Sequence, residues 1–216
     1  MKKVSLPIIH PLVDEPEGAL DRIVTLLEED QALRHAEYDK PDPKRRRLRV
    51  SCNQCDVPWC CNQRVAVEFV EALVIFRWAA THAPVALAHA IDRGHKLRGA
   101  PPMTDAEFFR RRVTCPFLIK NECSIFPVRP HRCRSHYMAG NPMKCRDELQ
   151  PKETYEMSPD NALLAEIDAL ADDVRFNHFI EGARPTELAE LMAFIDGLLQ
   201  RGPWKSPRVL DWDLVG

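Results

Sequence analysis

The residues best suited to chemistry in this chain are its eight cysteines, all of which lie between Cys52 and Cys145. The first group contains Cys52, Cys55, Cys60 and Cys61. Cys52 and Cys55 form a Cys-x2-Cys turn, which brings two thiolates to one side of a tight loop where they can share an ion. Thiolates select zinc, copper(I) or iron–sulfur centres and exclude calcium and magnesium. The first group therefore predicts a thiolate-bound metal.

The second group is spread over a longer stretch and contains Cys115, Cys123, Cys133 and Cys145. Eight sulfurs would satisfy two tetrahedral four-thiolate sites, or one site with additional thiols. In a reducing compartment, clustered cysteines are metal ligands or redox groups more often than disulfide partners. We therefore predict that all eight cysteines bind a metal or cluster, with a set of buried structural thiols as the alternative.

Cys60 and Cys61 are neighbours in the chain and raise a geometric question. Side chains alternate in direction along an extended chain, so two adjacent thiolates would share one tetrahedral ion only with backbone strain. The sequence predicts that these two cysteines serve different centres. In the alternatives, only one of them ligates, while the other bridges, stays unligated or packs as a small apolar residue.

Histidines and arginines surround the last part of this region. His131 and His136 flank Cys133 and would complete a zinc site only if one cysteine were not a ligand. Four thiolates around Zn²⁺ or a [4Fe–4S]²⁺ core leave a net charge of about −2, which nearby guanidinium groups offset. We predict that role for Arg129 and Arg134. We also expect three aromatic side chains to shield the site from water, namely Trp59, Phe117 and Phe126.

These motifs, taken in order, resemble the YkgJ-type cysteine cluster family, which is described as a zinc- or iron-chelating domain. The similar segment spans residues 52–137 and contains, after its Cys-rich start, Cys-Pro-Phe-Leu at 115–118, Cys-Ser-Ile-Phe at 123–126 and Arg-Pro-His-Arg-Cys-Arg at 129–134. The family has two residues between its second and third cysteines where this chain has four, which is typical of a divergent branch. The resemblance implies metal ligation by Cys52, Cys55, Cys60, Cys61, Cys115, Cys123 and Cys133. Cys145 lies beyond the similar segment and is included on composition alone.

Composition restricts the class of protein. The 30 Lys and Arg residues nearly cancel the 32 Asp and Glu residues, and a net charge of −2 disfavours a nucleic-acid-coating protein. The N-terminal segment has no apolar core typical of a secretory signal, and no run of 18 apolar residues predicts a membrane span. We expect a cytoplasmic protein without a membrane partner.

The apolar pattern predicts a mainly α fold with small β pieces around the cysteines. We expect an N-terminal helix and a basic loop in residues 1–50, a cysteine-cluster core in 51–146, and a C-terminal helical hairpin in 147–216 that packs on the core or on a protein or peptide partner. In the N-terminal helix, the periodicity places Asp30 on the solvent face. The individual elements predicted are helices at 17–38, 69–81, 85–97, 163–174 and 188–198, a strand at 64–68, a short helix after a capping box at Thr104 and Glu107, and a β-hairpin within 116–126.

Three functions remain open from the sequence. The first is a cytoplasmic cysteine-cluster protein that chelates iron, as an iron–sulfur cluster, or zinc. The second is an iron–sulfur-dependent enzyme that modifies a protein or peptide, because similar clusters occur in flagellin lysine N-methylases. No glycine-rich nucleotide loop or radical-type Cys-x3-Cys-x2-Cys spacing accompanies the cysteines. The third is a zinc-stabilised module that binds a partner through the C-terminal helices.

Overall fold

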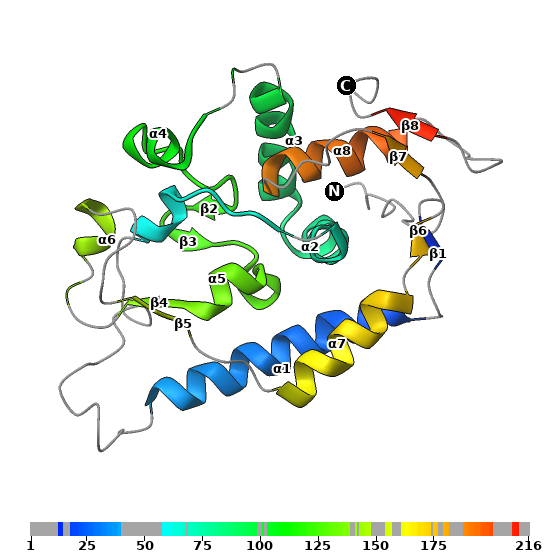
Figure 1. The fold of residues 1–216 in the computed structure, drawn as a ribbon, viewed down its shortest axis with the longest axis horizontal. Coiled ribbons are helices and arrows are strands. Elements are labelled where there is room, and N and C mark those ends of the chain that lie inside the picture. The colour runs from blue at the N-terminus through cyan, green and yellow to red at the C-terminus, as the bar shows by residue number, and fades with distance from the viewer. Residues whose placement is uncertain are drawn as a thin grey trace.

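Helices dominate the computed structural model of this chain, and the strands are short (Figure 1). The structure describes residues 13–14, 18–39, 58–67, 69–98, 101, 103–138, 141, 143–147, 154–156, 161–173, 175–176, 179–181, 188–200 and 209–211. Among these residues, no helix is long and apolar enough to cross a membrane.

The elements follow one another in this order along the chain. The α-helices are α1 (Ala19–Asp39), α2 (Phe69–His82), α3 (Pro84–Arg98), α4 (Asp105–Arg110), α5 (His131–Ser135), α6 (Lys144–Asp147), α7 (Asn161–Asp173) and α8 (Leu188–Gln200). The 3-10 helices are η2 (Trp59–Asn62) and η3 (Phe126–Val128). The strands are β1 (Val13–Asp14), β2 (Leu118–Ile119), β3 (Glu122–Cys123), β4 (His136–Met138), β5 (Thr154–Glu156), β6 (Arg175–Phe176), β7 (Phe179–Glu181) and β8 (Val209–Asp211).

The strands form two-stranded pairs. β1 pairs antiparallel with β6, β2 with β3, and β4 with β5, while β7 and β8 run parallel. Such short pairs bury little surface by themselves, so the helices must provide the core. The predicted class, mainly α with small β pieces, is therefore confirmed.

The predicted helices form close to their expected limits, because each has a clear local signal. The capping box at α4 is complete: the backbone N–H of Glu107 donates to the Thr104 hydroxyl at 3.2 Å, and the backbone N–H of Thr104 donates to the Glu107 carboxylate at 3.0 Å. Pro84 occupies the first position of α3, where its missing N–H costs nothing. The strand predicted at 64–68 is wrong, because within 64–67 only Ala66 makes a single bridge pairing.

The β-hairpin predicted within 116–126 is confirmed as β2 and β3. Its two-residue turn is Lys120-Asn121, and both residues have positive φ, at 51° and 65°. Two positive φ values are the mark of the turn that matches the twist of a tight hairpin, and asparagine tolerates this conformation well. The hairpin places Leu118 opposite Cys123 and so sets the position of that thiol.

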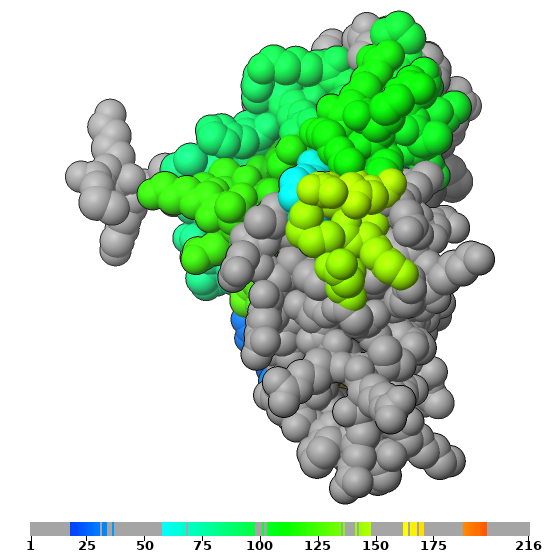
Figure 2. Space-filling model, turned by 90° about the vertical axis from the view of Figure 1, so that its left-hand side faces the viewer, coloured from blue at the N-terminus to red at the C-terminus, as the bar shows by residue number. Residues whose placement is uncertain are grey.

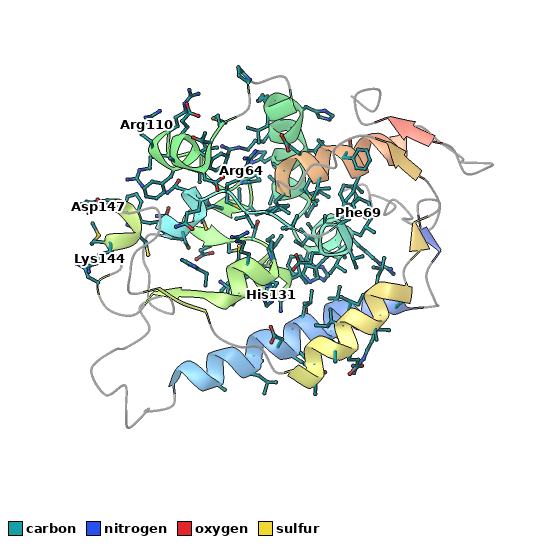
Figure 3. The ribbon with its side chains drawn as sticks, viewed as in Figure 1. Arg64, Phe69, Arg110, His131, Lys144 and Asp147 are labelled. Atoms are coloured by element: carbon teal, nitrogen blue, oxygen red, sulfur yellow. The ribbon has the colours of Figure 1, made fainter. Side chains whose placement is uncertain are left out.

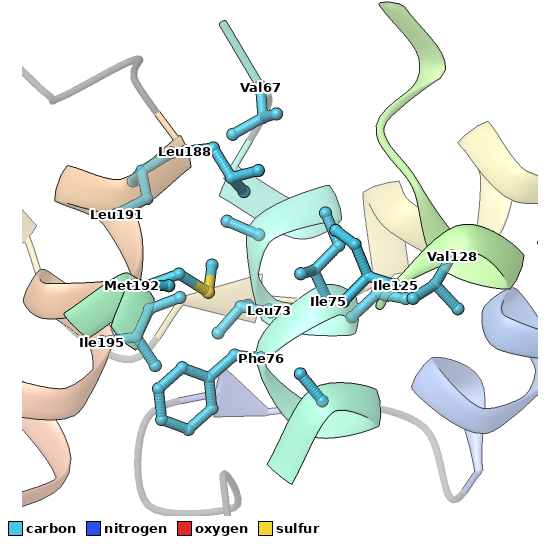
Figure 4. Packing of buried hydrophobic residues seen from close by; sticks show 14 of the residues in the cluster. Val67, Leu73, Ile75, Phe76, Ile125, Val128, Leu188, Leu191, Met192 and Ile195 are labelled. Carbon is cyan, nitrogen blue, oxygen red and sulfur yellow. The ribbon is translucent and has the colours of Figure 1, made fainter. Parts of the chain in front are cut away.

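The hydrophobic core is built around α2, which is apolar on most of its surface. On one side Leu73 and Phe76 face α8, and on the other side Ile75 faces Ile125 and Val128 of the segment after the hairpin (Figure 4). The cluster also includes residues of α1, among them Leu20 and Ile23, so the three segments predicted from the sequence share one core. α2 therefore links the cysteine region to both ends of the chain.

The two C-terminal helices do not form the predicted hairpin. α8 crosses α3 and α2, whereas α7 lies along α1 on the opposite side of the molecule (Figure 1). The guanidinium of Arg22 on α1 donates to the Glu166 carboxylate of α7 at 2.8 Å. The prediction failed because both helices carry apolar faces, and an apolar face in the sequence does not say which other face it will meet.

α8 and α3 approach each other most closely at Gly94. A Cβ atom at this position would collide with the backbone oxygen of Ala189 and would lie 2.7 Å from the Cβ of Ala193. The small residues on both helices permit this contact, which closes one side of the core.

Candidate metal centre

Cys60 and Cys61 lie in the 3-10 helix η2 and not in extended chain. Their thiols point to the same region and hydrogen-bond to each other. The premise that adjacent thiols project to opposite sides is therefore wrong here. A helical turn rotates neighbouring side chains by about a third of a turn, so both sulfurs can face one site.

Two hydrogen bonds attach η2 to the start of the hairpin. The backbone N–H of Cys115 donates to the carbonyl of Cys61 at 2.6 Å, and the Thr114 hydroxyl donates to the buried side chain of Asn62 at 3.1 Å. Residues more than fifty positions apart in sequence are thus fixed side by side. Cys115 comes to lie next to Cys61 as a result.

Five thiols from three parts of the fold are close enough to influence one another's ionisation. The negative charge that Cys115 or Cys123 would carry raises the pKa of Cys61, and the charges of Cys60, Cys115 and Cys123 raise that of Cys133. We call this group the thiol cluster: Cys60 and Cys61 on η2, Cys115 and Cys123 on the hairpin, and Cys133 on α5.

The thiols of the cluster differ in acidity. The pKa of Cys60 is lowered to about 7, mainly because the Cys61 thiol donates a hydrogen bond to it, with the charge of Arg129 adding to the effect. Cys60 is an exposed residue, yet the protein around its sulfur opposes this shift by partial desolvation. The pKa of Cys61 is raised because its proton is held in that hydrogen bond and because it is desolvated. The pair therefore shares one proton, with the thiolate on Cys60.

Burial dominates at the other end of the cluster. Desolvation is the main cause that raises the pKa of both Cys123 and Cys133, and the positive charge of Arg129 opposes it at each thiol. Arg129 is thus the cation that lowers the pKa at three members of the cluster. This agrees with its predicted position beside the sulfurs.

The aromatic side chains surround the site less evenly than predicted. Phe117 is fully buried beneath the hairpin, as expected of a residue that shields the sulfurs. Phe126 is 37% exposed and instead carries the guanidinium of Arg129 at 4.2 Å from its ring centre. Trp59 faces the guanidinium of Arg112 at 5.7 Å. Phe126 therefore positions the cation and does not close the site.

Arg134 has a different role from the one predicted. Its side chain is 2% exposed and donates to the Asp30 carboxylate of α1 at 2.5 Å, while Glu71 of α2 lies 3.9 Å away. Its Nε–H also donates to the carbonyl of Arg129 at 2.8 Å. Its charge therefore balances carboxylates, whereas Arg129 faces the thiols.

Asp30 and Glu71 are site-supporting residues that sequence reasoning missed. Asp30 is 1% exposed, so its predicted place on the solvent face is wrong. A signal was present, because Asp30 follows Ile23 by seven residues and Leu27 by three, which continues the buried line of α1. Glu71 accepts the backbone N–H of His131 at 2.6 Å, at the start of α5 near the centre of Figure 3. Together these carboxylates hold the helix that carries Cys133.

The remaining candidates lie at the edge of the cluster or outside the described residues. Cys145 is 7% exposed on α6, which packs against η2, and the two elements meet on the surface in Figure 2. His136 lies on β4 opposite Glu156. Cys52, Cys55 and the basic loop at 44–49 lie outside the described residues.

Among the described parts of the chain, no three His, Cys, Asp or Glu side chains are arranged so that they could hold a metal ion. The thiol cluster is thus a gathering of sulfurs that share one site, with the Cys-x2-Cys turn of the first group outside the described residues. As a donor set it consists of soft sulfur ligands with a guanidinium beside them, which fits zinc or an iron–sulfur centre by its chemistry.

Comparison with known proteins gives no relative from which a role can be transferred. No protein-family model, curated protein or solved structure matches this chain.

Proposed function

We propose that this chain is a cytoplasmic metal protein that binds an iron–sulfur cluster, or alternatively zinc, through cysteine thiolates. The observation that carries the proposal is the thiol cluster, in which five sulfurs from η2, the hairpin and α5 influence one another's ionisation. Cysteines gathered from distant segments cost the fold conformational entropy and the burial of polarisable thiols, which a bound metal would repay. The resemblance to YkgJ-type proteins supports the same function.

The proposed ligands divide into two sets. The five cysteines of the thiol cluster are the main donors, and Cys52 and Cys55 join them through their Cys-x2-Cys spacing. Cys145 is an additional candidate because α6 lies against η2. When bound, an iron–sulfur cluster would supply one-electron redox chemistry, whereas zinc would supply structural stability. Arg129 would offset the negative charge that several thiolates bring to the centre.

The test is metal analysis of protein purified without oxygen. Iron and sulfide in equal amounts with a broad visible absorption would identify a cluster, and stoichiometric zinc in colourless protein would identify a zinc site and favour the interaction module. Cys133→Ser should reduce the metal content by at least half, because a hydroxyl is a poor ligand for soft metals. The control is Arg132→Gln, an exposed residue on the same short helix, which should retain full metal content. Wild-type protein that contains neither metal would contradict the proposal.

A further inference from the structure

An open groove of about 580 Å³ lies between α3 and the segment from Arg111 to Ile119. Its α3 side carries Asp92, Arg93 and Lys96, and its other side carries Arg111 and the first strand of the hairpin. Pockets for small molecules measure about 300–1,000 Å³, so the groove has the size of a ligand site.

The charges in this groove are not balanced. Lys96 and Asp92 neutralise each other, because their nitrogen and oxygen lie 2.5 Å apart. Arg93 donates to the carbonyl of Thr114, a neutral acceptor that leaves its positive charge without a counterion. The exposed guanidinium of Arg111 makes no hydrogen bond or ion pair with any described residue. Two arginines on opposite sides of the groove therefore present unneutralised charge to the same space.

The rest of the lining is apolar. Leu97, Met103, Val113, Leu118 and Ile119 line the groove and are all partly exposed. A ligand that filled the groove would cover these side chains, and each square ångström of apolar surface removed from water contributes about 25 cal/mol. The groove thus combines an apolar wall with two cationic groups.

We propose that this groove binds a small organic acid whose carboxylate lies between Arg93 and Arg111 and whose apolar body lies along the hairpin side. A carboxylate accepts paired hydrogen bonds from a guanidinium in a planar geometry that a hydroxyl or an amide does not reproduce. Cys115 lines the groove and also belongs to the thiol cluster, so the bound acid lies next to the proposed metal centre. The binding itself does not depend on that centre, because neither arginine is a proposed ligand.

The test uses octanoate as the probe, followed by calorimetry or by NMR of the full chain. Octanoate should bind saturably at one site, while acetate, which lacks the apolar body, and octan-1-ol, which lacks the charge, should each bind at least about tenfold more weakly. Arg111→Gln should weaken octanoate binding about tenfold, since it removes a charge-assisted hydrogen bond.

The matched control is Arg110→Gln. Arg110 precedes Arg111 in the chain, is highly exposed on α4 and does not line the groove (Figure 3). This variant has the same change in net charge and should bind octanoate as the wild type does. Because Arg111 is exposed, its variant should fold normally, and circular dichroism checks this.

Three results would overturn the proposal. They are the absence of saturable octanoate binding, an equal loss of affinity in the Arg110 and Arg111 variants, and tight binding of a peptide C-terminal carboxylate in place of octanoate. Metal content is measured on the same samples. Octanoate binding to protein without metal would support the groove while contradicting the proposed metal function, so the two failures are distinguishable.

Discussion

At the scale of single residues, one hydrogen bond decides which thiol of the cluster is most acidic. The Cys61 thiol donates to Cys60, so the pKa of Cys60 falls while that of Cys61 rises. A thiolate is both the nucleophile and the metal ligand, whereas a thiol is neither. In metal-free protein, Cys60 is therefore the sulfur prepared to react or to bind first.

This difference predicts a pH profile for alkylation of the metal-free protein. The rate at which iodoacetamide modifies Cys60 should rise with pH and reach half its maximum at about pH 7. Cys61→Ala removes the hydrogen-bond donor, so the midpoint should move upward toward the ordinary value for cysteine. Mass spectrometry of the modified peptides measures both profiles. An unchanged midpoint in the variant would show that Arg129, and not Cys61, sets the acidity of Cys60.

The buried ion pair of Asp30 and Arg134 is the second feature at this scale. Removal of one partner leaves a buried charge with less compensation, which costs about 3–5 kcal/mol. Asp30→Asn should therefore lower the free energy of unfolding by an amount in that range, as measured by urea denaturation. The matched control is Glu166→Gln, because the Arg22–Glu166 pair joins two helices at the surface and should contribute at most about 1 kcal/mol. Equal losses in the two variants would contradict a special role for burial.

At the scale of elements, the contact between α3 and α8 depends on small residues. Gly94 lies where any side chain would meet the backbone of α8, which cannot move as easily as a flexible side chain. Alanine is normally the better helix former by about 1 kcal/mol, so propensity and packing act in opposite directions at this position.

We predict that packing dominates. Gly94→Ala should destabilise the protein by about 1–3 kcal/mol, the usual cost of overpacking, in spite of its gain in helix propensity. Chemical denaturation measures the change. The control is His95→Ala, which alters the exposed neighbour on the same helix and should change stability by less than about 0.5 kcal/mol. A more stable Gly94→Ala protein would mean that the two helices can move apart at low cost.

At the scale of the whole molecule, the fold divides its work between a helical core and a cysteine region. α2, α3 and α8 bury a continuous apolar cluster that needs no ligand. η2, the hairpin and α5 are short, and short elements of this kind are marginal without outside support. Their support comes from the contacts with α2, from the Asp30–Arg134 pair and, under the proposed function, from the metal.

Metal removal should therefore act on one part of the molecule. After chelation without oxygen, amide hydrogen exchange should become faster at residues 58–63 and 114–135, because the thiolates would no longer hold these segments together. Exchange in α3 and α8 should change much less. Mass spectrometry of peptides from these regions measures both. Equal acceleration everywhere would indicate that the core also depends on the metal, and no change at the cysteines would contradict a metal centre there.

The sequence by itself predicted the elements whose signals are local. The capping box of α4, the proline at the start of α3, the apolar periodicity of α2 and the Asn-containing turn of the hairpin each act within a few residues, so they were predictable from sequence. The gathering of cysteines was also expected from their types and spacing. The extended chain assumed at Cys60 and Cys61 was wrong because no local signal distinguished it from the helical turn η2.

Only the tertiary structure decided which surfaces meet. It placed α7 on α1 and α8 on α3, directed Arg134 to Asp30 while leaving Arg129 beside the thiols, and formed the groove between Arg93 and Arg111. Each of these is a contact between residues distant in the chain. An apolar face or a charged side chain is compatible with many partners, and the choice among them depends on how all the buried surfaces pack together at once.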